Sequence, residues 1–272
     1  MLGIEGLALL RGVITGSDEN AADRVAGLRR FLASDDAALD EPIAFPEHTV
    51  EHGYAAWSET YDRPGNPLIH LEETVLLPLL ASLRPGRALD AACGTGRVAA
   101  HLAAAGHDVV GVDTTPEMLE LARRRVPGAR FVEGRLQALP VEDASFDVVV
   151  CCLALEHSAE LGPPVSELAR AARQGGRVVV TNLHPFLVQL GGQGAFTDSG
   201  GTWGFVRSYP HLPGDYLRAF AAAGLELDEL FEPTPDRTWF ELQPAAWAHA
   251  PEAFLQGFEG IPAASIWSLV RR

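Results

Sequence analysis

The pattern of hydrophobic and polar positions changes near residue 80. Before that point, apolar residues recur at helical spacing, as at Val25, Leu28 and Leu32, and no alternation typical of a strand occurs. After it, short apolar runs alternate with helical patterns, which is typical of a parallel sheet with helices on both faces. We therefore expect an N-terminal helical cap or lid at residues 1–80 and an α/β domain at residues 81–272.

Five apolar runs in the second segment predict parallel strands, and two later runs predict closing strands. The run at residues 146–152 is continuously apolar, as expected of a strand buried on both faces. The helix before the fifth strand is expected to stop at Gly175 and Gly176. The predicted strands cover residues 87–90, 108–113, 129–133, 146–152, 177–182, 225–231 and 265–270.

Residues 185–213 form a long stretch with little periodicity, rich in glycine and aromatic residues. Loops of this length are usually functional. Because the stretch follows the fifth strand, it should lie over the carboxyl ends of the strands, where open α/β sheets bind ligands. We therefore expect a lid insertion here, and its aromatic side chains favour a bulky hydrophobic substrate.

The first predicted strand turns directly into a glycine-rich loop. It ends at Asp90, and the following Gly94 and Gly96 allow a ligand to approach the backbone closely. A helical pattern begins at Arg97, so unpaired backbone N–H groups gather at the loop. The spacing from Gly94 through Gly96 to Ala99 fits the dinucleotide fingerprint, so the glycines alone leave both NAD and S-adenosylmethionine open as ligands.

Two aspartates help to distinguish an NAD site from an S-adenosylmethionine site. Asp90 ends the first strand and Asp113 ends the second. A dinucleotide site uses an acid after its second strand, but an acid at the end of the first strand would lie unfavourably close to a pyrophosphate. S-adenosylmethionine has no phosphate, and it offers an ammonium, a sulfonium and a ribose diol. The pair therefore favours S-adenosylmethionine, although Asp90 could instead cap a helix without a ligand.

The sequence Leu-Asp-Ala-Ala-Cys-Gly-Thr-Gly at residues 89–96 resembles the first motif of the class I S-adenosylmethionine-dependent methyltransferases. Within that class it is most similar to the small-molecule group that includes the quinone methyltransferases. Gly-Val-Asp at residues 111–113 resembles their second motif. The resemblance implies an α/β fold with a Rossmann-like, doubly wound, mostly parallel seven-stranded sheet, whose antiparallel last strand inserts between its neighbours.

The resemblance has two departures. Ala92 stands where the family usually has its first glycine, and Arg135 stands where many relatives have an aspartate that binds the adenine amine. Because arginine cannot accept a hydrogen bond, Gln137, Glu133 or a backbone carbonyl must accept one from that amine.

The resemblance also implies which residues bind the cofactor. Asp90 and the backbone of residues 91–94 are expected to hold the methionine end, and Asp113 the ribose hydroxyls, with Thr114 and Met118 near the adenine. The expected cofactor-binding residues are Tyr61, Asp90, Ala91, Ala92, Cys93, Gly94, Asp113, Thr114, Met118, Leu136, Gln137 and Leu153.

Histidines near the strand ends are the candidate catalytic bases. Methyl transfer is an in-line displacement, so the enzyme mainly aligns two reactants, and a base is needed only if the substrate must lose a proton. His157 is the first candidate because it follows the fourth strand. His184, His211 and Tyr54 are alternatives, and each could be purely structural. Tyr54 and Tyr61 share a helix face that either packs in the core or closes over the sulfonium by cation–π attraction.

The amino-acid composition argues against several classes of ligand and binding partner. The 272 residues include 21 arginines, no lysine and 36 acids, giving a formal net charge of -15, which argues against a nucleic-acid partner. The lack of lysine excludes a P-loop and a Schiff-base lysine. We expect no metal, because residues 152–153 and 181–182, at the ends of the fourth and fifth strands, include no acid, and because no cluster has zinc spacing. Three cysteines without a suitable pairing, and an apolar N-terminal segment too short to span a bilayer, predict a cytoplasmic protein.

These features predict an enzyme, an S-adenosylmethionine-dependent methyltransferase of specialised metabolism. We expect it to act on a small, largely hydrophobic acceptor, with O-methylation favoured over N- or C-methylation. We expect a monomer or homodimer with no membrane or nucleic-acid partner. Two alternatives stay open: a protein of the same fold that binds the cofactor without transferring methyl, for example a cyclase, and an NAD-dependent oxidoreductase.

Overall fold

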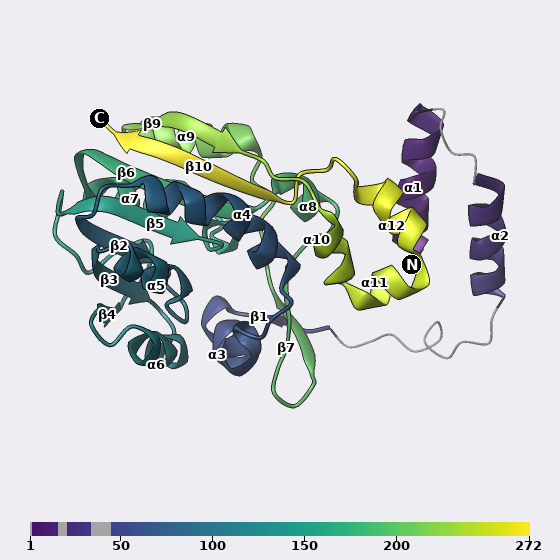
Figure 1. The fold of residues 1–272 in the computed structure, drawn as a ribbon, viewed down its shortest axis with the longest axis horizontal. Helices are drawn as coiled ribbons and strands as arrows, with labels where there is room; N and C mark the ends of the chain where they lie inside the picture. The colour runs from purple at the N-terminus through teal and green to yellow at the C-terminus, as the bar shows by residue number, and fades with distance from the viewer. Residues whose placement is uncertain (1, 16–20, 34–44) are drawn as a thin grey trace.

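A seven-stranded sheet forms the body of the protein (Figure 1). The computed structural model describes residues 2–15, 21–33 and 45–272. The strand order is β4-β3-β2-β5-β6-β10-β9, and β10 runs in the direction opposite to the other six strands. This confirms the predicted Rossmann-like, doubly wound sheet with its inserted antiparallel strand. The strands are β2 (Arg87–Ala91), β3 (Asp108–Asp113), β4 (Arg130–Glu133), β5 (Phe146–Cys152), β6 (Ala172–Leu183), β9 (Leu225–Phe231) and β10 (Ala264–Arg271).

Strand β6 begins earlier than the sequence predicts. The preceding helix α7 (Gly162–Ala171) ends before the two glycines, and Ala172 already pairs with Phe146 of β5. Gly175 and Gly176 lie inside β6, where Gly175 has a φ of 72° and the register with β5 shifts. The expected helix stop at these glycines was therefore wrong, because strand pairing begins before them and they form an irregularity within the strand.

Helices cover both faces of the sheet and give the core two layers. Successive residues of a strand point to opposite faces of the sheet. Ala88 therefore packs with α4, α5 and α6 on one face, and Leu89 packs with α7 and α9 on the other. Within the described ranges, no helix is long and apolar enough to cross a membrane. The helices not yet bounded are α4 (Pro67–Ser82), α5 (Arg97–Ala104), α6 (Pro116–Arg125) and α9 (Pro213–Ala222).

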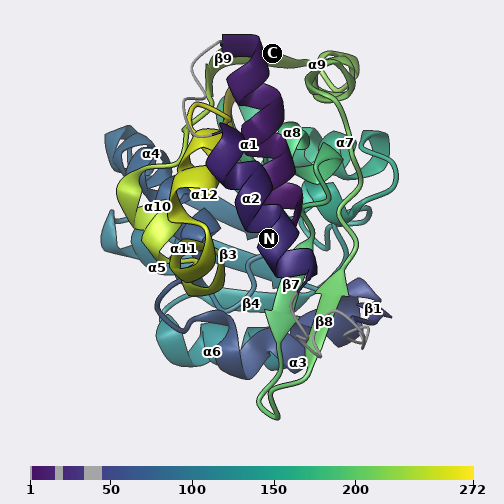
Figure 2. The ribbon, with the colours of Figure 1, turned by 90° about the vertical axis from the view of Figure 1, so that its right-hand side faces the viewer.

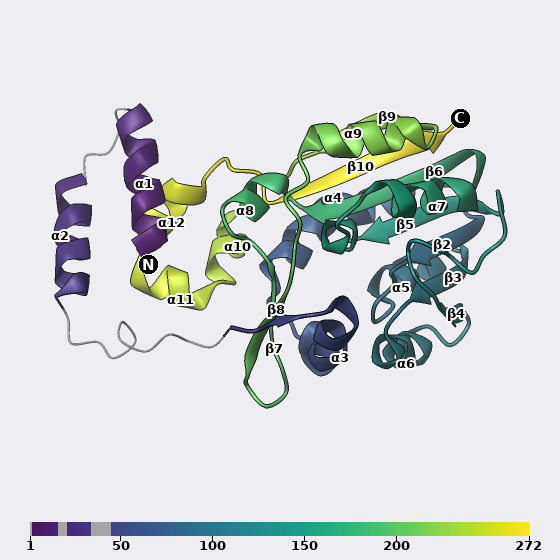
Figure 3. The same ribbon diagram turned by 180° about the vertical axis from the view of Figure 1, so that it is seen from behind.

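A group of helices at the amino-side end of β10 joins distant parts of the chain (Figures 1 and 3). Helix α12 packs against α1, and Arg11 of α1 donates a hydrogen bond to the carbonyl oxygen of Gly257, 246 residues away. Sequence reasoning did not predict the helices between β9 and β10. Residues 16–20 and 34–44 of the expected N-terminal cap lie outside the described residues. The helices are α1 (Leu2–Thr15), α2 (Ala21–Leu32), α10 (Arg237–Glu241), α11 (Pro244–His249) and α12 (Pro251–Phe258).

Residues 185–213 contain regular structure and not a simple loop. Helix α8 (Pro185–Gln189) precedes a hairpin of β7 (Gly194–Thr197) and β8 (Trp203–Val206), and β1 (Glu47–His48) adds a parallel strand (Figure 2). This small sheet packs against α3 (Val50–Tyr61). A Cβ on Gly53 would lie only 2.3 Å from a side-chain carbon of Val206, so the close packing of α3 on β8 requires glycine there.

Candidate active site

The glycine-rich loop lies at the point where the strand order reverses, between β2 and its neighbours β3 and β5. Ala92, Gly94 and Gly96 have φ values of 60°, 51° and 79°. A Cβ on Gly96 would lie 3.1 Å from the Cα of Ala122, so this glycine also permits close packing of α5 on α6. Ala92 adopts a backbone conformation that is unfavourable for a residue with a side chain, which is a common feature of ligand sites.

A cavity of about 180 Å³ lies at the carboxyl ends of β2, β3, β4 and β5, and we call it the cofactor cavity. Eight of the predicted cofactor-binding residues line it. The other four are buried but do not line it. The lining members are Tyr61, Ala92, Gly94, Asp113, Thr114, Leu136, Gln137 and Leu153. The remaining members are Asp90, Ala91, Cys93 and Met118.

Asp113 reaches the cofactor cavity from the end of β3. Its Oδ2 atom accepts a hydrogen bond from the backbone N–H of Gly94 at 2.8 Å, and Oδ1 accepts one from that of Thr115 at 2.9 Å. Each carboxylate oxygen can accept a further hydrogen bond. The side chain is therefore held in one orientation and can still accept hydrogen bonds from a diol.

Asp90 lies beneath the loop and is 1% exposed. Its Oδ2 atom has no hydrogen-bond partner among the described residues. Burial raises the pKa of this carboxyl group to about 7, although the positive charge of Arg97 acts against the shift. An unpartnered buried carboxylate beneath the loop fits a cationic ligand bound at the loop, because a nearby positive charge would stabilise the ionised form.

We predict that cofactor affinity depends on pH through Asp90. The folded-state pKa of about 7 exceeds the ordinary 3.8, so the stability of the ligand-free protein should fall as pH rises from about 4 to 7. A cationic ligand favours ionised Asp90, so binding near pH 7 should release about half a proton, and affinity should rise up to about tenfold between pH 6 and 8.

Calorimetry with S-adenosylmethionine in two buffers of different ionisation enthalpy measures this proton release. Asp90→Asn should abolish it, whereas Asp108→Asn at the exposed start of β3 should leave it unchanged. Equal proton release by the native protein and Asp90→Asn would refute the assignment.

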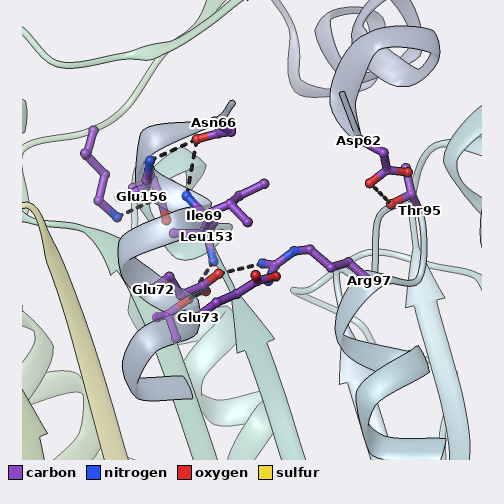
Figure 4. Close-up of polar contacts among 12 residues, drawn as sticks. Asp62, Asn66, Ile69, Glu72, Glu73, Thr95, Arg97, Leu153 and Glu156 are labelled. Atoms are coloured by element: carbon purple, nitrogen blue, oxygen red, sulfur yellow. Dashed lines mark hydrogen bonds and ion pairs between the residues drawn. The ribbon is translucent and has the colours of Figure 1, made fainter. Parts of the chain in front are cut away.

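Helix α3 forms the outer wall of the cofactor cavity and is tied to its rim at both ends. Near its start, Glu51 pairs with Arg135 at 3.1 Å. After its end, Asp62 accepts a hydrogen bond from Thr95 Oγ1 at 2.9 Å (Figure 4) and pairs with Arg125 at 2.6 Å. Arg135, which replaces the aspartate of many relatives, therefore joins the cavity rim to an acid on α3.

A buried network supports the other side of the loop. Glu72 of α4 is fully buried and accepts hydrogen bonds from Arg97 at 2.5 Å and from Thr181 at the end of β6 (Figure 4). Arg97 also pairs with Glu73 at 2.9 Å. Since Arg97 is the first residue of α5, these contacts fix the loop relative to α4 and the sheet.

Tyr54 of α3 and His157 meet where a substrate could approach the cofactor. His157 Nδ1 lies 2.7 Å from the carbonyl oxygen of Arg207, which can only accept, so Nδ1 carries the proton. In the neutral ring Nε2 is then an acceptor, and the Tyr54 hydroxyl, 3.0 Å away, donates to it. Burial raises the pKa of Tyr54 well above its ordinary value, so the phenol remains protonated.

The other two candidate histidines line neither this cavity nor the larger one described next. His184 is 2% exposed, and its Nδ1 accepts the backbone N–H of Phe186 while Nε2 donates to Glu232 at 3.0 Å. His211 Nε2 donates to the carbonyl oxygen of Ser158 at 2.6 Å. Both rings are thus engaged in local structure, and the structure brings together only Tyr54 and His157 among the candidate bases.

A second cavity, of about 700 Å³, adjoins the first, and we call it the acceptor cavity. Tyr54, Tyr61, Leu153 and His157 line both cavities. The walls of the acceptor cavity come from α3, α8, the β7–β8 hairpin and the helices after β9. Its aromatic lining residues are Tyr54, Trp57, Tyr61, Phe196, Trp203, Trp239, Phe254 and Phe258.

Residues 89–180 match a family model described as a methyltransferase domain. The malonyl-acyl-carrier-protein O-methyltransferase of Pseudescherichia vulneris is 35% identical over 137 residues, which cover 50% of this chain and 54% of that protein. The demethylmenaquinone methyltransferase of Beutenbergia cavernae is 43% identical over 98 residues, 36% of this chain and 41% of that protein. Residues 89–180 therefore belong to a methyltransferase domain.

The methyltransferase domain also resembles solved structures in fold. A S-adenosylmethionine-dependent methyltransferase from Mesorhizobium loti has a TM-score of 0.57 and 21% identity, with 75% of this chain and 100% of that chain covered. The cyclase SpnF has a TM-score of 0.59 and 18% identity, with 85% and 97% covered. The chain spans about half or less of the length of the two sequence relatives.

The methyltransferase domain fits the cofactor of its family, S-adenosylmethionine. Among the described residues, Arg135 is the one arginine that lines the cofactor cavity, and it is paired with Glu51. No free guanidinium therefore faces this cavity to bind a pyrophosphate. Asp113 and the unpartnered oxygen of Asp90 suit a ligand with a diol and positive charges.

The acceptor side of the methyltransferase domain includes residues that sequence reasoning missed. Trp239, Phe254 and Phe258 come from α10 and α12. Pro244 and Pro251, each in the first turn of a helix, were usable signals for helix starts in this segment. Sequence reasoning also did not predict that Glu156 lines the acceptor cavity, and its position next to His157 in the sequence was the one available signal.

Proposed function

We propose that the protein transfers a methyl group from S-adenosylmethionine to a small, largely hydrophobic acceptor of specialised metabolism, with oxygen as the attacked atom. The observation that carries the proposal is the junction of the two cavities at Tyr54, Tyr61, Leu153 and His157. A methyl donor in the first cavity and an acceptor in the second would meet there. The aromatic walls of the acceptor cavity support an apolar substrate, because such cavities bind ligands mainly by burying apolar surface.

The proposed reaction needs alignment and a proton acceptor. When bound, S-adenosylmethionine supplies a methyl group on a sulfonium leaving group. Asp113 and the loop at residues 92–96 orient the donor, while α3 and the aromatic walls exclude water. The hydroxyl proton of the acceptor moves to Nε2 of His157 by one of two paths. It moves directly if the Tyr54 hydroxyl first breaks its hydrogen bond with Nε2. Otherwise the Tyr54 hydroxyl accepts this proton and passes its own to Nε2. The new oxygen–carbon bond forms as the carbon–sulfur bond breaks, leaving a neutral thioether.

Binding and product analysis test the proposal separately. S-adenosylmethionine and S-adenosylhomocysteine should each raise the melting temperature, whereas NAD should not; a ligand at 100 times its Kd adds about 2.7 kcal/mol of stability. Incubation with a panel of phenols and apolar hydroxy compounds should give products heavier by one methylene group. Stabilisation by NAD alone would overturn the cofactor assignment. An isomerised substrate of unchanged mass would favour the cyclase alternative.

A further inference from the structure

The acceptor cavity has two charged wall residues besides His157, and only one of them has its side chain hydrogen-bonded to other residues. Glu156 is 3% exposed, and its two oxygens accept hydrogen bonds from the Asn182 side chain at 2.9 Å and from the backbone N–H of Leu183 at 3.2 Å. The other residue is Arg63, in the turn between α3 and α4. No described residue forms an ion pair or a side-chain hydrogen bond with its guanidinium.

Arg63 is exposed and, like Arg84 and Arg130, forms no ion pair with a described residue, but it differs from them in lining the acceptor cavity. The sequence has 36 acids and 21 arginines, so a carboxylate is available for most arginines. The adjacent Asp62 does not pair with Arg63, because its carboxylate pairs with Arg125 and accepts a hydrogen bond from Thr95 of the glycine-rich loop. An arginine left unpaired in a cavity wall is available to bind an anion from outside the chain.

Asn66 adds donors beside Arg63. Its Oδ1 atom accepts the backbone N–H groups of Leu68 and Ile69 at 3.0 and 3.2 Å, which fixes the orientation of the amide (Figure 4). Its NH₂ group is therefore left as a donor, and Asn66 lines the acceptor cavity. The residue also caps α4, whose positive end adds to the attraction for an anion.

We propose that the acceptor carries an anionic group, a carboxylate, sulfonate or phosphate, which Arg63 binds with the help of Asn66. Arg63 also borders a polar hollow that is lined by the ion pairs of Arg97 with Glu73 and of Arg125 with Asp62, and that His157 does not line. The anion and the methylated atom therefore occupy different sides of the cavity. The substrate is an amphiphile: an apolar or aromatic body with its accepting oxygen toward His157 and its acid toward Arg63. This inference rests on the proposed function for the identity of the cavity.

Two fluorescent probes with the same ring system test the charge preference. 8-Anilinonaphthalene-1-sulfonate carries a sulfonate, and N-phenyl-1-naphthylamine lacks it. With S-adenosylhomocysteine present, the native protein should bind the sulfonate about tenfold more tightly than the neutral probe. Arg63→Gln should remove that preference and leave binding of the neutral probe unchanged, while Arg130→Gln, on an exposed residue of β4, should leave both unchanged.

Equal binding of both probes by the native protein, or an undiminished preference in Arg63→Gln, would overturn the inference. Competition by 1-naphthoate and 1-naphthyl phosphate for the sulfonate probe shows whether the site prefers a carboxylate or a phosphate. Thermal stabilisation of Arg63→Gln by S-adenosylhomocysteine, measured in parallel, reports on the proposed function. Loss of the charge preference with this stabilisation intact supports the Arg63 site, whereas failure of the stabilisation in the native protein refutes the proposed function instead.

Discussion

Replacing His157 with alanine is expected to lower kcat by about 100-fold and to leave the Kd for S-adenosylmethionine within about twofold. The 100-fold figure is the lower end of the usual range for general-base catalysis, because alignment of the reactants persists in the variant. His157 accepts the Tyr54 hydroxyl and donates to the backbone at Arg207, so its ring is oriented for proton transfer without contacting the glycine-rich loop. Steady-state kinetics together with calorimetry separate the two effects.

Two variants sharpen this experiment. Tyr54→Phe keeps the His157 ring but removes the hydroxyl between it and the cavity, so a loss equal to that of His157→Ala would identify the hydroxyl as the proton path. His101→Ala, on the exposed surface of α5, is the matched control and should retain native kcat. Native turnover in His157→Ala would remove His157 as the base.

Asp113→Ala is expected to weaken S-adenosylmethionine binding by at least about 100-fold. Hydrogen bonds to a charged group contribute about 1.5–3 kcal/mol each, and a ribose diol would make two with this carboxylate. The substitution also leaves the N–H groups of Gly94 and Thr115 without their acceptor, which loosens the loop. Calorimetry measures the change in Kd, and the melting temperature of the ligand-free variant reports the structural part.

The control for Asp113→Ala lies on the same strand. Asp108 begins β3 at its other end, and its side chain is 76% exposed, so Asp108→Ala should bind the cofactor with native affinity. Asp113→Asn keeps one acceptor oxygen and should give an intermediate Kd. An unchanged Kd in Asp113→Ala would show that the ribose does not contact this residue.

The strands of the parallel sheet were predictable because their signal is local. A buried parallel strand is a short apolar run, and the carboxylates in the last residues of β2 and β3 mark the carboxyl edge of the sheet. The insertion of β10 between β6 and β9 depends on pairing between distant segments, which periodicity does not encode. That feature came only from the family resemblance.

The sequence predicts active-site residues that lie at the ends of strands. It does not predict contacts between residues that are far apart in the sequence. Asp113 lines the cofactor cavity, but the sequence could not distinguish it from Asp90, which is buried beneath the loop and does not line that cavity. The contact between Tyr54 and His157 joins residues 103 positions apart. Both had been named as candidates, yet nothing in the sequence places them together, and their catalytic roles stay predictions.

The position of β10 has a consequence for synthesis of the protein. A ribosome makes β6 and β9 before the strand that separates them, so both leave the exit tunnel while their shared neighbour is still missing. Until residues 264–271 emerge, each of these nascent strands exposes an unpaired edge, which favours association with other chains. The sheet is therefore completed only at the end of translation of this domain, and chaperones that cover strand edges have the longest opportunity to act there.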